Sequence, residues 1–257
     1  MTITEQRSVP AARRLDGRTA VVTGSGQGIG LAIATRLAQE GAAVALVDLN
    51  APTEAVERLR AAGATVSGHV ADVSDPTSVR ELVAPVAEAV GDPDIVVNNV
   101  GSYSFMKLDE ITIDRWRRVF AINLESMLLT TQAFMPRMKE RGWGRIVNIT
   151  SNSIALQVPD AVHYTSSKLA VIGLTRGLAT ELAPYGITAN AVAPTMTRTP
   201  GTSAAPEELM QQVADQQTIK RIGRPEDLVG AVAFLASADA DFVTAQTLYV
   251  DGGLVRS

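Results

Sequence analysis

Short apolar, β-branched runs alternate along the chain with longer stretches of helical periodicity. The strands predicted from the runs are Ala20–Thr23, Ala43–Asp48, Thr65–Val70, Ile95–Asn98, Arg145–Thr150, Ile187–Ala193 and Thr247–Val250. The helices predicted between them are Gly28–Glu40, Thr53–Ala62, Pro76–Val90, Thr112–Arg141, Tyr164–Ala183 and Pro225–Ala236. This alternation predicts an α/β fold, a single doubly wound domain with a parallel seven-stranded sheet and helices on both faces.

Two stretches depart from the simple alternation. Residues 195–224 follow the sixth predicted strand and are rich in Thr, Gln, Pro and Met. Because ligands in open α/β sheets bind outside the carboxyl ends of the strands, we expect this stretch to form a flexible lid over a site. The predicted helix Tyr164–Ala183 is apolar on several sides. It is therefore expected to pack on the sheet with one face and against a second subunit with another.

The composition of the chain limits the number of domains and the classes of binding partner. The chain has 257 residues, of which 46% are hydrophobic, enough for one large domain. We expect residues 1–14 to be a flexible extension and residues 15–257 to form the domain. The net charge of −4, with no long basic run, argues against nucleic acid as the main partner. No stretch reaches the ~20 apolar residues needed to span a bilayer, so no membrane contact is expected.

The residue types absent from the chain exclude further chemistry. There is no cysteine, which rules out disulfides, thiolate metal sites and cysteine nucleophiles. The two histidines, His69 and His163, lie outside any metal-ligand motif, so no metal is expected. The first residues lack the apolar core of a secretory signal, which favours a cytoplasmic protein.

Tyr164 and Lys168 are the candidate centre of an acid–base reaction. Four residues apart on a helix, they project from the same face. A phenol has a solution pKa near ~10, and an ammonium one turn away is expected to lower the pKa of Tyr164. The Ser151 hydroxyl lies thirteen positions before Tyr164 (164 − 151 = 13) and is suited to hold a substrate oxygen. Tyr-x-x-x-Lys alone also occurs by chance in ordinary helices.

A glycine-rich turn points to a dinucleotide. Thr23-Gly24-Ser25-Gly26-Gln27-Gly28-Ile29-Gly30 ends the first predicted strand and opens a helix. Glycines at such a turn allow the backbone to approach a pyrophosphate at the helix N-terminus, as in Rossmann-type domains. Asp48 ends the second strand, where a carboxylate can accept hydrogen bonds from ribose hydroxyls and repel a 2′-phosphate. Gln27 and Asn50 are neutral, which favours NAD over NADP.

Further polar residues follow the third and fourth predicted strands. These are Asp72 and the run Asn98-Asn99-Val100-Gly101. The carboxyl ends of parallel strands share one edge of the sheet, so these residues are expected to lie near the glycine-rich turn. Turn chemistry explains Asp, Asn and Gly at such positions equally well.

Together these motifs resemble those of the short-chain dehydrogenase/reductase family, from about Leu15 to the C-terminus. The resemblance implies a catalytic tetrad of Asn123, Ser151, Tyr164 and Lys168. Tyr164 would be the general acid or base, Lys168 would lower its pKa and bind the nicotinamide ribose, Ser151 would polarise the substrate oxygen and Asn123 would anchor a water. The cofactor residues it implies are Gly24, Gln27, Gly28, Ile29, Gly30, Asp48, Leu49, Asp72, Val73, Asn99, Val100, Gly101, Tyr164, Lys168, Pro194, Thr197 and Thr199.

The chain departs from the family pattern at two positions. Val100 stands where Ala is usual, and Thr195 where Gly is usual after Pro194. Neither change removes a catalytic group. Both bear on substrate and lid geometry.

The candidate substrate residues are Tyr103, Ser151, Ser153, Val158 and Met196. They are mixed rather than cationic, which argues against a polyanionic substrate. The segment Met196–Thr199 and the ending Asp251–Arg256 are similar to those of NAD-dependent secondary-alcohol dehydrogenases, including 1-phenylethanol-type enzymes. The expected function is interconversion of a secondary alcohol and a ketone, in a homotetramer implied by the resemblance. The alternatives are a 3-oxoacyl-carrier-protein reductase and a non-catalytic dinucleotide sensor.

Overall fold

The computed structural model describes residues 13–103 and 105–256. Seven parallel strands form one sheet in the order β3-β2-β1-β4-β5-β6-β7. Their bounds are β1 Thr19–Thr23, β2 Ala43–Asp48, β3 Val66–Val70, β4 Ile95–Asn98, β5 Gly144–Ile149, β6 Ile187–Pro194 and β7 Thr247–Val250. The order reverses between β1 and β4, which makes the sheet doubly wound and confirms the predicted fold class. The predicted extension lies, up to residue 12, outside the described residues.

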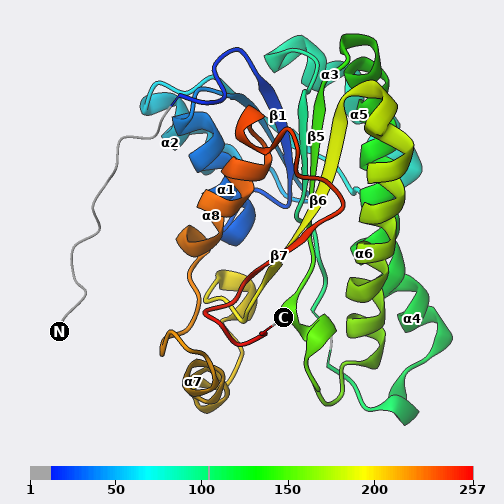
Figure 1. The fold of residues 1–257 in the computed structure, drawn as a ribbon, viewed down its shortest axis with the longest axis vertical. Coiled ribbons are helices and arrows are strands. Elements are labelled where there is room, and N and C mark those ends of the chain that lie inside the picture. Colours follow the sequence, from blue (N-terminus) through cyan, green and yellow to red (C-terminus); the bar gives the residue numbers. More distant parts are fainter. Residues whose placement is uncertain (1–12, 104, 257) are drawn as a thin grey trace.

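Helices cover both faces of the sheet (Figure 1). On one face lie α1 (Gly28–Gln39), α2 (Thr53–Ala61) and α8 (Pro225–Leu235), which share an apolar core with the strands. On the other face α3 (Pro76–Val90), α5 (Ser126–Arg141) and α6 (Val162–Leu182) enclose a second core. Strands buried on both faces require continuous apolar runs, which is why β1, β4 and β5 are buried along their whole length. No helix of the described residues is both long and apolar enough to cross a membrane.

The predicted helical stretch over residues 112–141 is present, but it contains a π-helical turn. The helix α4 (Ile113–Phe120) leads into a π-helical turn over Ala121–Glu125, and α5 begins at Ser126. Asn123, within this turn, is fully buried. A π turn widens the helix by one residue, and such turns are frequent at functional sites. Hydrophobic periodicity over so short an insertion carries no clear sign of it.

The bounds of other elements also differ from the predictions. Helix α6 begins at Val162, two residues before the predicted start, so Tyr164 lies within the first turn. Residues 195–224, expected to form a flexible lid, contain a helix, α7 (Glu207–Gln216). Its apolar residues Met210 and Ala214 are buried, which stabilises the helix against the rest of the chain. In Figure 1, α7 lies below α8 and across from α4.

A chain of buried polar side chains crosses the sheet behind the site. Asn98 and Asn148 are register partners on β4 and β5, and Asn98 Nδ2 donates to Asn148 Oδ1 at 2.9 Å. Thr130 of α5 donates to Asn98 Oδ1 at 2.5 Å, and Asn148 Nδ2 donates to Thr175 of α6 at 3.0 Å. Buried amides with satisfied partners fix one arrangement of their elements. This network holds α5 and α6 in position on one face of the sheet.

Candidate active site

The glycine-rich turn between β1 and α1 is shaped by close backbone contacts. A Cβ at Gly30 would lie 2.1 Å from the carbonyl oxygen of Gly24, so no other residue fits there without moving the turn. Gly24 and Gly28 have positive φ values of 62° and 59°, a region that favours glycine. The turn therefore leaves the N-terminus of the twelve-residue α1 open to an anionic group.

Asp48 closes one side of this turn. Its Oδ2 accepts a hydrogen bond from the Gly26 amide at 2.9 Å, and its Oδ1 accepts one from the Asn50 amide at 3.3 Å. Each carboxylate oxygen keeps a free lone pair, which suits acceptance from a ribose hydroxyl. The predicted position of Asp48 beside the glycine-rich turn is what the structure shows.

Asn99, after β4, bonds to this turn, whereas Asp72, after β3, bonds to its own loop and to α4. Asn99 Nδ2 donates to the carbonyl oxygens of Thr23 and Gly24, both at 3.0 Å. Asp72 accepts from the Ser74 amide at 2.9 Å and lies 3.8 Å from the Arg118 guanidinium. The Ser74 hydrogen bonds and Arg118 hold the pKa of the Asp72 carboxyl below its usual range. Arg118, on α4, was not singled out from the sequence because a charged residue on an exposed helix face carries no distinguishing pattern.

The remaining predicted cofactor residues line the same edge of the sheet. Leu49 is exposed, Val73 is buried, and Val100 lies against Gly24, since a Cβ there would meet Val100 Cγ2 at 3.1 Å. The bulk of Val100 at this position is thus accommodated only because residue 24 is a glycine.

Ser151 follows β5 and hydrogen-bonds the Tyr164 phenol, and Tyr164 and Lys168 lie in the first two turns of α6. All three side chains are buried. The Lys168 ammonium donates to the carbonyl oxygen of Ile149 at 3.0 Å, and the Thr150 hydroxyl donates to the Lys168 carbonyl at 2.7 Å. A Cβ on Gly101 would lie 3.2 Å from Lys168 Nζ, so the motif after β4 borders the same space.

The electrostatics of the phenol differ from the expectation. Burial raises the pKa of the Tyr164 phenol well above its usual range, and the adjacent Tyr103 acts in the same direction, while a hydrogen bond with Ser151 opposes both. The Lys168 ammonium donates to the Ile149 carbonyl, and its expected lowering of the pKa of Tyr164 stays a prediction. Burial also lowers the pKa of Lys168, to about 8. Such shifts in a shared site are typical of functional residues.

Asn123 lies in the π turn, beside this group. Its Oδ1 accepts from the Ser102 amide at 2.7 Å, and its Nδ2 donates to the Ser102 carbonyl at 3.2 Å and to Ser167 Oγ at 2.9 Å. Ser167 in turn donates to the carbonyl oxygen of Tyr164 at 2.7 Å. Both amide protons of Asn123 are used, so one lone pair on Oδ1 is left for a water. Its predicted role as a water anchor stays a prediction.

Two aromatic residues of the loop after β4 contact Tyr164. The ring centroids of Tyr103 and Phe105 lie 5.6 and 6.5 Å from that of Tyr164. Phe105 was missed in the sequence, since a lone aromatic in a loop gives no periodic signal. Of the other predicted substrate residues, Val158 and Met196 are half-buried. Ser153 is buried, and its hydroxyl has no hydrogen-bond partner among the described residues.

The start of residues 195–224 lies against the glycine-rich turn. Pro194 ends β6, and a Cβ on Gly28 would meet Thr199 Cβ at 3.4 Å. Thr197 bridges Gly223, so the two ends of this segment are joined. Thr195, the departure from the usual glycine, donates to Gln217 at 2.8 Å and ties β6 to the end of α7.

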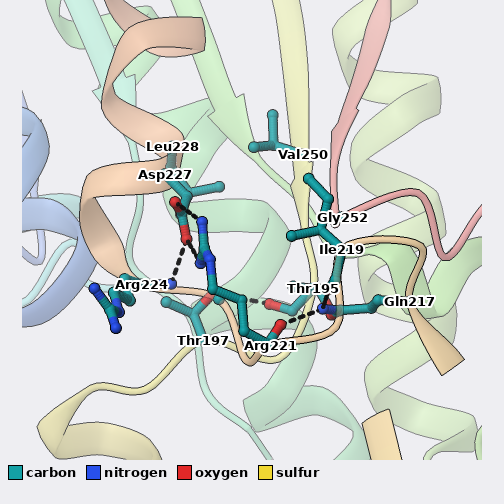
Figure 2. A pocket seen from close by; sticks show the side chains of 11 residues that line it. Thr195, Thr197, Gln217, Ile219, Arg221, Arg224, Asp227, Leu228, Val250 and Gly252 are labelled. Atoms are coloured by element: carbon teal, nitrogen blue, oxygen red, sulfur yellow. Dashed lines mark hydrogen bonds and ion pairs between the residues drawn. The ribbon is translucent and has the colours of Figure 1, made fainter. Parts of the chain in front are cut away.

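A cavity of about 190 Å³ lies between these two ends (Figure 2). Arg221 and Asp227 pair across one side of it at 2.6 Å, and Gln217 donates to the Ile219 carbonyl at 3.1 Å. Its lining residues are Thr195, Thr197, Gln217, Ile219, Arg221, Gly223, Arg224, Asp227, Leu228, Val250 and Gly252, none of them from the group around Tyr164. The Arg221–Asp227 pair and the bonds of Gln217 to Thr195 and Ile219 stabilise the conformation of this segment.

A phosphate-binding turn on a doubly wound sheet, beside a buried Tyr–Lys–Ser group, defines the class of dinucleotide-dependent oxidoreductases. A family model described as Enoyl-(Acyl carrier protein) reductase matches residues 24–255. The chain is 38% identical over 244 residues to (2S)-[(R)-hydroxy(phenyl)methyl]succinyl-CoA dehydrogenase subunit BbsD of Thauera aromatica, with 93% of this chain and 97% of that protein covered. These matches extend over nearly the whole chain, so they indicate a common family as well as a common fold.

Solved structures agree. A gluconate 5-dehydrogenase from Burkholderia cenocepacia J2315, in complex with NADP and tartrate, matches with a TM-score of 0.89 at 38% identity, covering 95% of this chain and 97% of that one. A 3-oxoacyl-acyl-carrier-protein reductase with bound NAD from Brucella melitensis matches with a TM-score of 0.90 at 34% identity, covering 100% and 98%. The chain belongs to the short-chain dehydrogenase/reductase family, and it is an oxidoreductase with a fold that binds a nicotinamide dinucleotide.

Proposed function

We propose that the protein interconverts a secondary alcohol and a ketone, with NAD(H) as the cofactor. The observation that carries the proposal is the buried group of Ser151, Tyr164 and Lys168 bordering Gly101, on the edge of the sheet that holds the glycine-rich turn. The Thauera aromatica relative supports it, because its name describes dehydrogenation of a hydroxy(phenyl)methyl group, a secondary alcohol. A bound nicotinamide supplies the hydride acceptor for alcohol oxidation and the hydride donor for carbonyl reduction.

The protein's own residues manage the proton. Ser151 holds the substrate oxygen by hydrogen bonding, and Tyr164 donates a proton to it in reduction or removes one in oxidation. The raised pKa keeps the phenol protonated at neutral pH, which is the form needed for carbonyl reduction. The Lys168 ammonium, which donates to the Ile149 carbonyl, would stabilise the negative charge that develops on the phenol oxygen.

The change from Tyr164 to Phe tests this role. Tyr164→Phe removes the proton donor but keeps the ring, so turnover should fall to about a hundredth of wild type or less, given the ~10²–10⁴ typical of acid–base catalysis. NAD binding, followed by the thermal shift it produces, should stay near wild type. Turnover persisting above that level would refute the assignment. The substrate is sought by following NADH formation with secondary alcohols, hydroxy acids, sugars and steroids.

The preference for NAD follows from the charge of Asp48. Its carboxylate, bonded to the amides of Gly26 and Asn50, would repel a 2′-phosphate on the adenosine ribose. NAD should therefore raise the melting temperature more than NADP does. The matched variant Asp48→Asn keeps an acceptor for Gly26 and removes the charge, so it should narrow the difference. A larger shift with NADP in the wild type contradicts the proposal.

The reductase of 3-oxoacyl carrier proteins is the second candidate, because a solved structure of that name matches this chain closely. Tyr185, just before Gly186-Ile187-Thr188, has Lys139 Nζ 4.5 Å above its ring. Faster reduction of a 3-oxoacyl thioester than of any simple ketone would favour this candidate. If the protein binds NAD but turns over neither simple alcohols and ketones nor the 3-oxoacyl thioester, the alternative of a non-catalytic dinucleotide sensor is favoured.

We also propose that residues 195–224 act as the substrate lid and that the protein is a homotetramer. The contact of Thr199 with the glycine-rich turn supports the lid. The exposed Leu128 of α5 and Leu169 of α6 support an interface on these helices, as expected for a helix with apolar residues on several sides. Light scattering coupled to size exclusion measures the assembly, and a monomer would contradict it.

A further inference from the structure

The rings of Tyr103 and Phe105 cover the catalytic phenol without being buried themselves. They are tilted by 33° and 38° to the Tyr164 ring, in the range of favourable aromatic pairs. Tyr164 is only 5% exposed, whereas Tyr103 and Phe105 are 54% and 56% exposed. One side of each ring thus packs on Tyr164, and half of the surface stays open beside it.

The aromatic pair is held from both sides. Before it, the amide and carbonyl of Ser102 both bond to the side chain of Asn123, at 2.7 and 3.2 Å. After it, the Met106 amide donates to the carbonyl oxygen of Asp160 at 2.6 Å. Asp160 itself has a φ of 55°, an uncommon conformation for a residue with a side chain. Two separate anchors, one of them at a strained residue, indicate that the rings are positioned for a purpose.

We propose that Tyr103 and Phe105 form an aromatic wall that binds a flat apolar group on the carbon bearing the reacting oxygen. The preferred substrates are then alcohols and ketones with an aromatic substituent on that carbon. This inference rests on the proposed function, because it takes the substrate oxygen to lie at Tyr164 and Ser151. With the oxygen held there, the substituent reaches the open halves of the two rings.

The size of the effect follows from ordinary aromatic contacts. A ring packed on a ring contributes ~0.5–1.5 kcal/mol beyond its buried area, and the burial adds to it. Removal of one ring of the wall should therefore weaken binding of an aryl substrate about tenfold. A small aliphatic alcohol makes little contact with the wall, so its kinetics should change much less.

The test compares 1-phenylethanol with 2-butanol as substrates of the wild type, Phe105→Ala and Phe105→Leu. We expect the wild type to have the higher kcat/KM for 1-phenylethanol. Phe105→Ala should reduce the aryl-to-alkyl ratio of kcat/KM about tenfold, mainly through KM, and Phe105→Leu should reduce it less. Tyr103→Phe retains the ring and should retain the ratio, even where turnover changes. The thermal shift with NAD establishes that each variant is folded.

Several results would overturn the inference. An equal loss on both alcohols in Phe105→Ala, or a change of oligomeric state in that variant, would make Phe105 a structural or interface residue. If the enzyme turns over other alcohols in a reaction that requires Tyr164 but shows no preference for 1-phenylethanol, the aromatic wall is refuted and the proposed function stands. If no alcohol is turned over in a reaction that requires Tyr164, both the aromatic wall and the proposed function are refuted.

Discussion

Replacing Lys168 by methionine should change how the stability of the protein depends on pH. The ammonium is buried, and burial lowers its pKa from 10.5 to about 8. Between these values the unfolded chain binds a proton that the folded chain does not, so the free energy of unfolding rises as the pH rises through this window. Below pH 8 both states are protonated and the full cost of burying the charge is present.

The magnitude follows from the shift. A difference of 2.5 units (10.5 − 8) at 1.36 kcal/mol per unit is a cost of about 3 kcal/mol at pH 7, almost absent by pH 10.5. Lys168→Met lacks this titration. Losing the hydrogen bond to the Ile149 carbonyl destabilises the variant by an amount that does not depend on the charge. The stability of the variant relative to wild type should therefore fall by about 3 kcal/mol between pH 7 and pH 10.5.

Urea unfolding at several pH values, without cofactor and at one protein concentration, measures this difference. Lys220→Met, at an exposed lysine, is the control and should show a nearly constant difference from wild type. A constant difference for Lys168→Met as well would show that the ammonium is not buried in the folded protein. Lys168 would then carry its charge in contact with solvent.

Two further substitutions test the backbone of the site. Gly30→Ala places a Cβ 2.1 Å from the Gly24 oxygen and should weaken NAD binding more than tenfold in titration calorimetry. The control is Gly177→Ala, at an exposed helical glycine with open space around it, which should bind NAD like wild type. Equal NAD affinities of the two variants would contradict the close approach at the turn. A valine at position 160 would be strained by ~1–2 kcal/mol at the φ of 55°, so Asp160→Val should raise KM for the alcohol severalfold. Asp160→Gly, which relieves this strain, should not raise KM. Equal KM values would show that the hydrogen bond from the Met106 amide to the Asp160 carbonyl does not position the loop after β4.

The sequence by itself predicted the order and type of nearly all elements. Apolar runs such as Val44–Val47 reveal buried parallel strands, because both faces of such a strand need apolar residues. The glycine-rich turn and Asp48 could also be placed, since glycine spacing and a strand-ending carboxylate depend on local backbone geometry. The grouping of Ser151, Tyr164 and Lys168 followed from helix periodicity and strand position, together with the family resemblance.

Tertiary structure decided what depends on contacts between distant segments. The π turn at Asn123 forms because its side chain bonds to Ser102 and Ser167, which no local pattern encodes. Phe105 reaches Tyr164 only because the Asp160 carbonyl, more than fifty residues away, anchors the loop. The raised pKa of Tyr164 likewise reflects its burial and the neighbouring Tyr103, which depend on the tertiary structure. Periodicity records which side of an element faces the core, whereas burial and hydrogen bonding of single groups are set by whichever segments meet there.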